Sequence, residues 1–248
     1  MTRPAFVLAS ASTARLRVLR DAGLDPVVVV SGADESNEAG LDTAALTGEL
    51  AGRKAAAVAA LRPDALVLGC DSLLDVDGEP FGKPGSAGHA RKMWQRIAGR
   101  EAVLYTGHCL IDGPAGRQVR GVASTLVRFG RPADAELETY LATGEPLSLA
   151  GAFSIEARTA PFVDSIDGHP STVLGLSMPM LRQLLADLGY AMTDVWDVRR
   201  SHRGRPLRVS RRAGCAPHDL ARAAACAGSR PAAGRCPASA AAPPAAPR

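Results

Sequence analysis

Hydrophobic and polar positions change their period repeatedly between residues 5 and 190, which is the pattern of an α/β domain. Short apolar runs typical of strands alternate with segments whose apolar residues recur every three or four positions, as in helices. The pattern predicts strands at 6–8, 26–30, 65–69, 101–112, 118–129 and 162–166. It predicts helices from an N-cap at Ser12 to Gly23 and at 42–61, 86–97, 132–141 and 178–188, with a hairpin at 73–81 around Asp77-Gly78.

Charge is distributed unevenly along the chain. The 248 residues carry a formal net charge of +4, but residues 199–248 hold eleven Arg, no Lys and one acid, which leaves 18 basic and 24 acidic residues in 1–198. The 199–248 segment is rich in Ala and Pro and has no aromatic residue, so it lacks both core-forming bulk and rings that stack on bases. We expect an ordered domain over 1–198, a disordered tail over 199–248 and no specific nucleic-acid partner.

No segment has the composition of a membrane span. The longest run without Asp, Glu, Lys or Arg is the 14 residues 168–181, whereas a spanning helix needs about 20. The apolar stretch 5–9 is too short for a secretory signal and is interpreted as a buried strand. The five cysteines lack the spacing of a zinc site, and their odd number favours reduced thiols. We therefore expect a cytoplasmic protein without a membrane partner.

Three lysines stand out because the chain otherwise carries its positive charge on arginine: Lys54, Lys83 and Lys92. A compact ammonium suits sites that a planar guanidinium does not, although each lysine can equally be a solvated surface residue. Lys83 lies in Gly82-Lys83-Pro84, a rigid loop that a solvent-facing lysine would not need. The loop is not a P-loop, since Pro84 stands where Ser or Thr would bind magnesium.

Polar groups also gather where two predicted strands end. Ser10 and Ser12 precede the first helix, whose free N–H groups can hold an anion, with Arg15 one turn later; an ordinary N-cap beside a surface arginine fits equally well. Asp71 follows the apolar residues 65–70, at the expected carboxyl end of a strand, where ligands gather in α/β sheets. There it can hold a divalent cation, accept a proton from water or serve as a simple turn residue.

Asp34 and Glu35 supply further carboxylates after the second predicted strand. The chain thus offers basic groups for phosphates and acidic groups for a metal ion, and no covalent nucleophile of recognisable spacing. This combination favours hydrolysis of a phosphoanhydride bond.

Nine motifs over about residues 5–196 resemble the Maf family in their order and spacing. They are Leu8-Ala9-Ser10-Ala11-Ser12-Thr13-Ala14-Arg15, Asp34-Glu35, Leu50-Ala51 with Lys54-Ala55, Gly69-Cys70-Asp71-Ser72, Gly82-Lys83-Pro84, Tyr105-Thr106-Gly107, Tyr140 with Gly144-Glu145-Pro146, Ala150-Gly151-Ala152-Phe153 and Val173-Leu174-Gly175-Leu176. The resemblance implies a nucleoside triphosphate pyrophosphatase. It also implies a fold like that of the inosine triphosphatases, with a long mixed sheet, flanking helices and a cleft between two lobes, in proteins that are commonly homodimers.

The resemblance also implies roles for individual residues. Asp71 matches the family's proton acceptor and metal-linked acid, and Glu35 matches a second acid near a divalent cation such as Mg²⁺ or Mn²⁺. The groups that match the family's triphosphate ligands are Ser10, Ser12, Arg15, Lys54 and Lys83. Lys92 has no match and is interpreted as a surface residue.

Base preference stays open, because two positions resemble different members of the family. Ser72 resembles members that select dTTP and UTP, whereas Glu156 resembles members that prefer 7-methyl-GTP. Thr13, Ala157 and Thr172 replace the family's usual Pro, Gly, and Asn or Ser. Alanine at 157 reduces activity if the position needs a positive φ.

The leading interpretation is an enzyme that converts a nucleoside triphosphate and water to the monophosphate and pyrophosphate, with Asp71 activating the water that attacks the α-phosphorus. Its purpose would be to remove non-standard nucleotides from the pool. Two alternatives stay open: a nucleotide-sensing regulator of septum formation whose output is binding, and a broad inosine-type triphosphatase.

Overall fold

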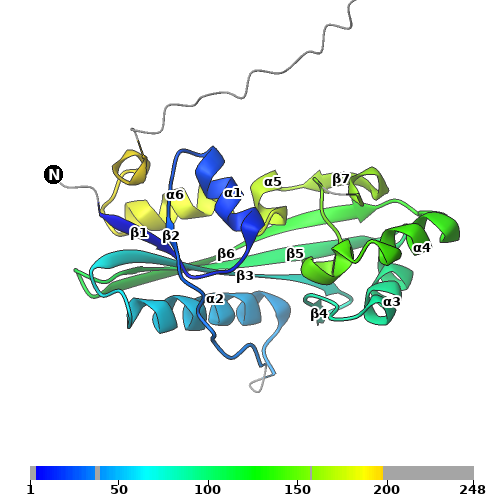
Figure 1. Cartoon of the computed structure of the whole chain (residues 1–248), viewed down its shortest axis with the longest axis horizontal. Helices are drawn as coiled ribbons and strands as arrows, with labels where there is room; N and C mark the ends of the chain where they lie inside the picture. The colour runs from blue at the N-terminus through cyan, green and yellow to red at the C-terminus, as the bar shows by residue number, and fades with distance from the viewer. Residues whose placement is uncertain (1–3, 37–39, 157, 198–248) are drawn as a thin grey trace, which may run out of the picture. The chain divides into compact units, whose positions relative to one another are not determined.

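The computed structural model describes residues 4–36, 40–156 and 158–197; the predicted tail at 199–248 and Ala157 lie outside these ranges. Within them, seven strands form one mixed sheet in the order β2-β1-β3-β5-β6-β7, with β4 paired to β3 (Figure 1). The predicted α/β class with a mixed sheet and flanking helices is confirmed. The strands are β1 (Ala5–Leu8), β2 (Val27–Val28), β3 (Ala65–Val76), β4 (Glu79–Phe81), β5 (Glu101–Asp112), β6 (Arg117–Phe129) and β7 (Val163–Asp167).

Helices cover both faces of the sheet. The long helix α2 lies on one face, and α1 and α6 lie on the other (Figure 1). The helices are α1 (Thr13–Asp21), α2 (Thr43–Ala59), α3 (Ala87–Ile97), α4 (Asp134–Ala142), α5 (Pro170–Val173) and α6 (Met178–Asp187), with 3₁₀ turns η1 (Glu145–Ser148), η2 (Ala150–Ala152), η3 (Ala160–Phe162) and η4 (Met192–Val195). No helix among the described residues is both long and apolar enough to cross a membrane.

Local signals place the ends of several elements. Ser12 caps α1 and Ser86 caps α3, each hydroxyl accepting a hydrogen bond from the backbone N–H three residues later. Asp77 and Gly78 have φ values of 59° and 83°, as a two-residue hairpin turn requires, and they join paired residues Val76 and Glu79. The predicted cap at Ser12 and the predicted hairpin are therefore confirmed.

Other predicted bounds were wrong. The strand predicted at 65–69 continues to Val76, because β5 pairs with it from Leu66 to Asp75. Asp71 is thus inside a strand and not at its end. The helix predicted at 132–141 begins at Asp134, since the Glu136 carboxylate accepts a hydrogen bond from the N–H of Ala133 and fixes the N-terminus there. The strand predicted at 26–30 is only Val27–Val28, and α5 and the 3₁₀ turns were not predicted.

Two glycines bring α2 into direct contact with the sheet. A Cβ at Gly69 would overlap the Ala51 carbonyl, and one at Gly107 would overlap the Thr47 carbonyl. Backbone therefore packs on backbone at both places, which only glycine allows. This contact fixes how far Lys54, on the same helix, stands from β3.

A notch interrupts the edge of β3 opposite β5. The parallel strand β1 pairs with β3 only as far as Leu68, and the antiparallel strand β4 pairs with it only from Leu74 onward. No described strand covers the edge between these two residues. Because successive residues of a strand face opposite sides, Asp71 and Ser72 point from this notch toward the two different faces of the sheet.

Candidate active site

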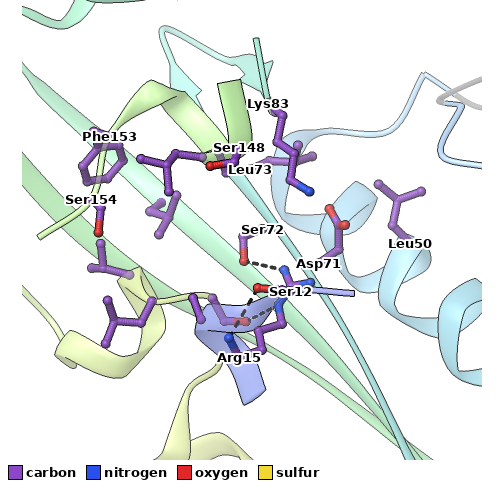
Figure 2. Close-up of a pocket in the computed structure, with 18 of the residues that line it drawn as sticks. Ser12, Arg15, Leu50, Asp71, Ser72, Leu73, Lys83, Ser148, Phe153 and Ser154 are labelled. Atoms are coloured by element: carbon purple, nitrogen blue, oxygen red, sulfur yellow. Dashed lines mark hydrogen bonds between the residues drawn. The ribbon is translucent and has the colours of Figure 1, made fainter. Parts of the chain in front are cut away.

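The notch in β3 opens into a cavity of about 390 Å³. Figure 2 shows Lys83 and Asp71 toward one end, Phe153 and Ser154 toward the other, and Ser72 and Arg15 between them. The charged side chains of its lining are Arg15, Arg17, Glu35, Lys54, Asp71 and Lys83. The neutral lining residues include Leu149, Ala150, Phe153, Ser154, Val173 and Leu174. The end near Lys83 and Asp71 therefore carries charge, whereas Phe153 and Ser154 present neutral side chains at the other end (Figure 2).

On the α2 face, one lysine joins two acids. Lys54 Nζ donates a hydrogen bond of 2.5 Å to Asp71 Oδ1 and lies 2.7 Å from Glu35 Oε1. The side chains of Lys54 and Asp71 are each only 10% exposed, whereas that of Glu35 is 64% exposed. The pKa of Glu35 is lowered, chiefly because Lys54 donates a hydrogen bond to it. No described residue donates to Asp71 Oδ2, the second oxygen of that carboxylate.

On the α1 face, Arg15 is held by three hydrogen bonds. Its Nε donates to the Gly175 carbonyl at 2.7 Å, and its two terminal nitrogens donate to Ser10 Oγ and Ser72 Oγ, each at 3.1 Å. A guanidinium has five N–H groups. Two of them, one on each terminal nitrogen, have no partner in the described part of the chain, and free guanidinium N–H donors suit a phosphate.

The remaining predicted site residues are placed differently from one another. Lys83 is exposed, lines the cavity and forms no ion pair with any described residue. Lys92 is exposed on α3 and is not part of the lining, as expected of a surface residue. Ser12 lines the cavity while capping α1. Glu156 does not line the cavity; it forms an ion pair with Arg17, which does.

The two carboxylates determine which metal ion the site could hold. Within residues 4–36, 40–156 and 158–197, no three His, Cys, Asp or Glu side chains are grouped as a metal site. Magnesium is commonly held by one or two carboxylates together with substrate phosphates. Asp71 and Glu35 meet at Lys54 and fit that arrangement, so a cation here would be shared between the protein and a bound triphosphate.

Several residues that shape this site had no role predicted from the sequence. Thr106 Oγ1 lies 3.0 Å from Ser72 Oγ and donates to the Thr172 carbonyl at 3.0 Å. His108 Nε2 accepts a hydrogen bond of 2.8 Å from the Ser177 N–H. The sequence signal that could have identified them is a pair of polar residues, Thr106 and His108, two positions apart in a largely apolar strand. Thr172, which replaces the family's usual residue, takes part through its backbone carbonyl.

Comparisons with known proteins agree with this arrangement. A family model described as Maf-like protein matches residues 5–188. The nucleoside triphosphate pyrophosphatase of Streptomyces coelicolor is 52% identical over 197 residues, which cover 78% of this chain and 95% of that protein. Proteins of the same name from Streptomyces avermitilis and Salinispora tropica are 49% identical over 200 residues and 51% identical over 196 residues. They are aligned over 79% and 77% of this chain and over 97% and 87% of their own lengths. The chain therefore belongs to the Maf family.

Proposed function

We propose that this chain is a nucleoside triphosphate pyrophosphatase that releases the nucleoside monophosphate and pyrophosphate. The observation that carries the proposal is the convergence of Asp71, Lys54, Glu35 and Arg15 on one notch of the sheet. The printed names of relatives about half identical to the chain support it.

The charged end of the cavity is the place for the triphosphate. Arg15 offers two N–H groups without a partner, and Lys83 offers an ammonium without a competing ion pair, both among the described residues. Lys54 brings a third positive charge but shares it with two carboxylates. Ser10 and Ser12 contribute by shaping the loop before α1, where the Ser10 hydroxyl accepts hydrogen bonds from Arg15 and from the Ser12 N–H.

Asp71 is the proposed proton acceptor. A water molecule attacks the α-phosphorus, its proton passes to the carboxylate, and the bond from the α-phosphorus to the bridging oxygen breaks, so that pyrophosphate leaves with the bond electrons. The hydrogen bond from Lys54 to Oδ1 holds the carboxylate in place and leaves Oδ2 for the proton. A divalent cation, Mg²⁺ or Mn²⁺, held by Asp71, Glu35 and phosphate oxygens, would neutralise the charge that develops on the phosphates.

The neutral end of the cavity is the proposed nucleoside site. Phe153 presents an aromatic ring there and Ser154 a hydroxyl, as Figure 2 shows. The ion pair between Glu156 and Arg17 connects this end to α1. Glu156 affects base choice in this proposal by acting through Arg17. Ser72 instead acts on Arg15, from which its hydroxyl accepts a hydrogen bond. The removal of non-standard nucleotides is the proposed biological role.

Phosphate release tests the proposal. The chain is incubated with standard and modified nucleoside triphosphates, with and without Mg²⁺ or Mn²⁺, and phosphate is measured before and after addition of inorganic pyrophosphatase. Phosphate that appears only after that addition supports the proposal, and Asp71→Asn should lower kcat by about 10² or more. Nucleotide binding without turnover would favour the regulator of septum formation, and phosphate without added pyrophosphatase would indicate cleavage at the terminal phosphate.

Two features expected from the resemblance stay predictions: the likeness to inosine triphosphatases with a cleft between two lobes, and a homodimer. The cytoplasmic location expected from the composition also stays a prediction. The domain boundary near residue 198 is likewise a proposal. Light scattering on the purified chain and on a chain ending at that residue would give the oligomeric state of both.

A further inference from the structure

Strand β5 carries two fully buried polar side chains close to the residues that hold Arg15. Thr106 and His108 are each 0% exposed, and because they are two residues apart they share one face of the strand. Ser72, on the neighbouring strand β3, pairs in register with Thr106 and touches its hydroxyl. Neither Thr106 nor His108 lines the cavity.

The hydrogen bonds around Thr106 have only one consistent direction. A carbonyl can only accept, so the single O–H of Thr106 is donated to Thr172. Ser72 must then donate to Thr106 Oγ1, which leaves Ser72 Oγ as the acceptor for Arg15. The result is one chain of hydrogen bonds from Arg15 through Ser72 and Thr106 to the carbonyl of Thr172.

His108 holds the other end of the same turn. Its Nε2 accepts from the N–H of Ser177, so the ring is neutral and carries its proton on Nδ1. Gly175 lies between Thr172 and Ser177 and has a φ of 92°. Its carbonyl accepts the hydrogen bond from Nε of Arg15. A Cβ at Gly175 would lie 3.2 Å from Nε of Arg15, so the guanidinium packs closely on this turn.

We propose that Thr106 and His108 are positioning residues for phosphate binding: they fix the 172–177 turn at its two ends and, through Ser72, hold the guanidinium of Arg15 with its two remaining N–H groups toward the triphosphate. The inference rests on the proposed function of Arg15. It adds that this function depends on side chains that never touch substrate.

Steady-state kinetics with UTP and with GTP test the inference. Thr106→Val keeps the shape of the side chain and removes its hydroxyl, and it should raise KM roughly tenfold for both nucleotides. His108→Leu should act in the same direction. Thr106→Ser keeps a hydroxyl and His108→Gln keeps a hydrogen-bond acceptor, so each should have a KM close to that of the wild type. An effect on one nucleotide only would overturn the proposal, because Arg15 is assigned to the phosphates common to both.

The Arg15→Ala background separates positioning from general damage. If Thr106 acts through Arg15, adding Thr106→Val to Arg15→Ala should change KM by less than about twofold. A full tenfold rise in that background would overturn the proposal. Arg15→Ala with an unchanged KM would instead refute the function proposed for Arg15, and a raised KM for Arg15→Ala beside a normal one for Thr106→Val would refute only the present inference.

Thr125 provides the matched control. It is a strand threonine, 1% exposed, whose hydroxyl has no partner among the described residues. Thr125→Val should fold and keep the KM of the wild type, which shows that a buried Thr-to-Val change is not harmful in itself. Should Thr106→Val fail to fold, the comparison of His108→Gln with His108→Leu decides: equal KM values for the two would overturn the proposal.

Discussion

Replacing Lys54 by methionine removes the positive charge that joins the two acids of the site while keeping the length of the side chain. The side chains of Lys54 and Asp71 are each 10% exposed, and Lys54 Nζ lies 2.5 Å from Asp71 Oδ1. The change therefore leaves the largely buried Asp71 carboxylate without the ammonium that pairs with it. Glu35 then adds a second negative charge near it. We expect Lys54→Met to destabilise the fold as well as to impair hydrolysis.

The burial of the ion pair sets the size of the effect. Removing one partner of a buried ion pair costs about 3–5 kcal/mol. The expected loss of unfolding free energy is therefore about 3–5 kcal/mol at pH 7.5, or roughly 6–20 °C in melting temperature for a domain of this size.

Urea unfolding followed by circular dichroism at pH 7.5 measures this loss. The double variant Lys54→Met with Asp71→Asn should regain most of the stability, since it removes the unpaired charge. Lys83→Met is the control: this lysine is exposed, and its replacement should change the unfolding free energy by no more than about 0.5 kcal/mol. A loss for Lys54→Met no larger than that for Lys83→Met, or a double variant no more stable than Lys54→Met, would refute the reasoning.

Lys83→Ala should lower kcat/KM at least tenfold, roughly the value of a charge-assisted phosphate contact, and Lys92→Ala by less than about twofold, so equal kinetics of the two would contradict the assignment. Glu156→Gln should shift the kcat/KM ratio toward dTTP or UTP by about tenfold or more, because it weakens the ion pair that holds Arg17 in the lining of the cavity; an unchanged ratio would remove Glu156 from base choice. Burial, helped by the nearby Arg15 charge, lowers the pKa of His108 to about 4, so below its ordinary value the unfolded chain binds a proton that the folded chain does not. Between pH 6.5 and pH 4 the wild type should lose up to about 3 kcal/mol more unfolding free energy than His108→Gln does. Equal losses for the two proteins in urea titrations would contradict this prediction. Ending the chain after residue 198 should leave kcat unchanged and the melting temperature within about 2 °C, because a segment with few core-forming residues is expected to bury little apolar area. It should also abolish weak, salt-sensitive retention on heparin, and aggregation of the shortened chain would show that the boundary is misplaced.

Features that depend on neighbouring residues could be predicted from the sequence. The cap of α1 joins Ser12 to the N–H of Arg15, and the hairpin turn needs only Asp77 and Gly78, so one short stretch contains both partners of each interaction. The alternation of hydrophobic and polar residues likewise predicted the two long paired strands β5 and β6 to within one residue of their observed bounds. Such signals locate elements and say little about what lies across the sheet from them.

The arrangement of the site depends on distant residues and could not be predicted in the same way. Asp71 was expected at a strand end because the apolar run 65–70 stops before it. The structure instead keeps the carboxylate inside the strand, paired with Lys54, seventeen positions earlier in the chain. The contact of Thr106 with Thr172 spans 66 positions, and that of Arg15 with Gly175 spans 160. The residue types were recognisable, but their division between the two faces of β3 follows only from the fold.

The direct packing of α2 on Gly69 and Gly107 gives the two sides of the site different mechanical stiffness. Lys54 stands on a helix that cannot approach the sheet without a collision of backbones. Arg15 is held by a short loop and the 172–177 turn, through hydrogen bonds that can stretch. Any adjustment to a bound triphosphate should therefore occur on the α1 side, while the α2 side keeps its dimensions. Stiffening the 172–177 turn would then change how phosphates are bound without altering the groups that perform the hydrolysis.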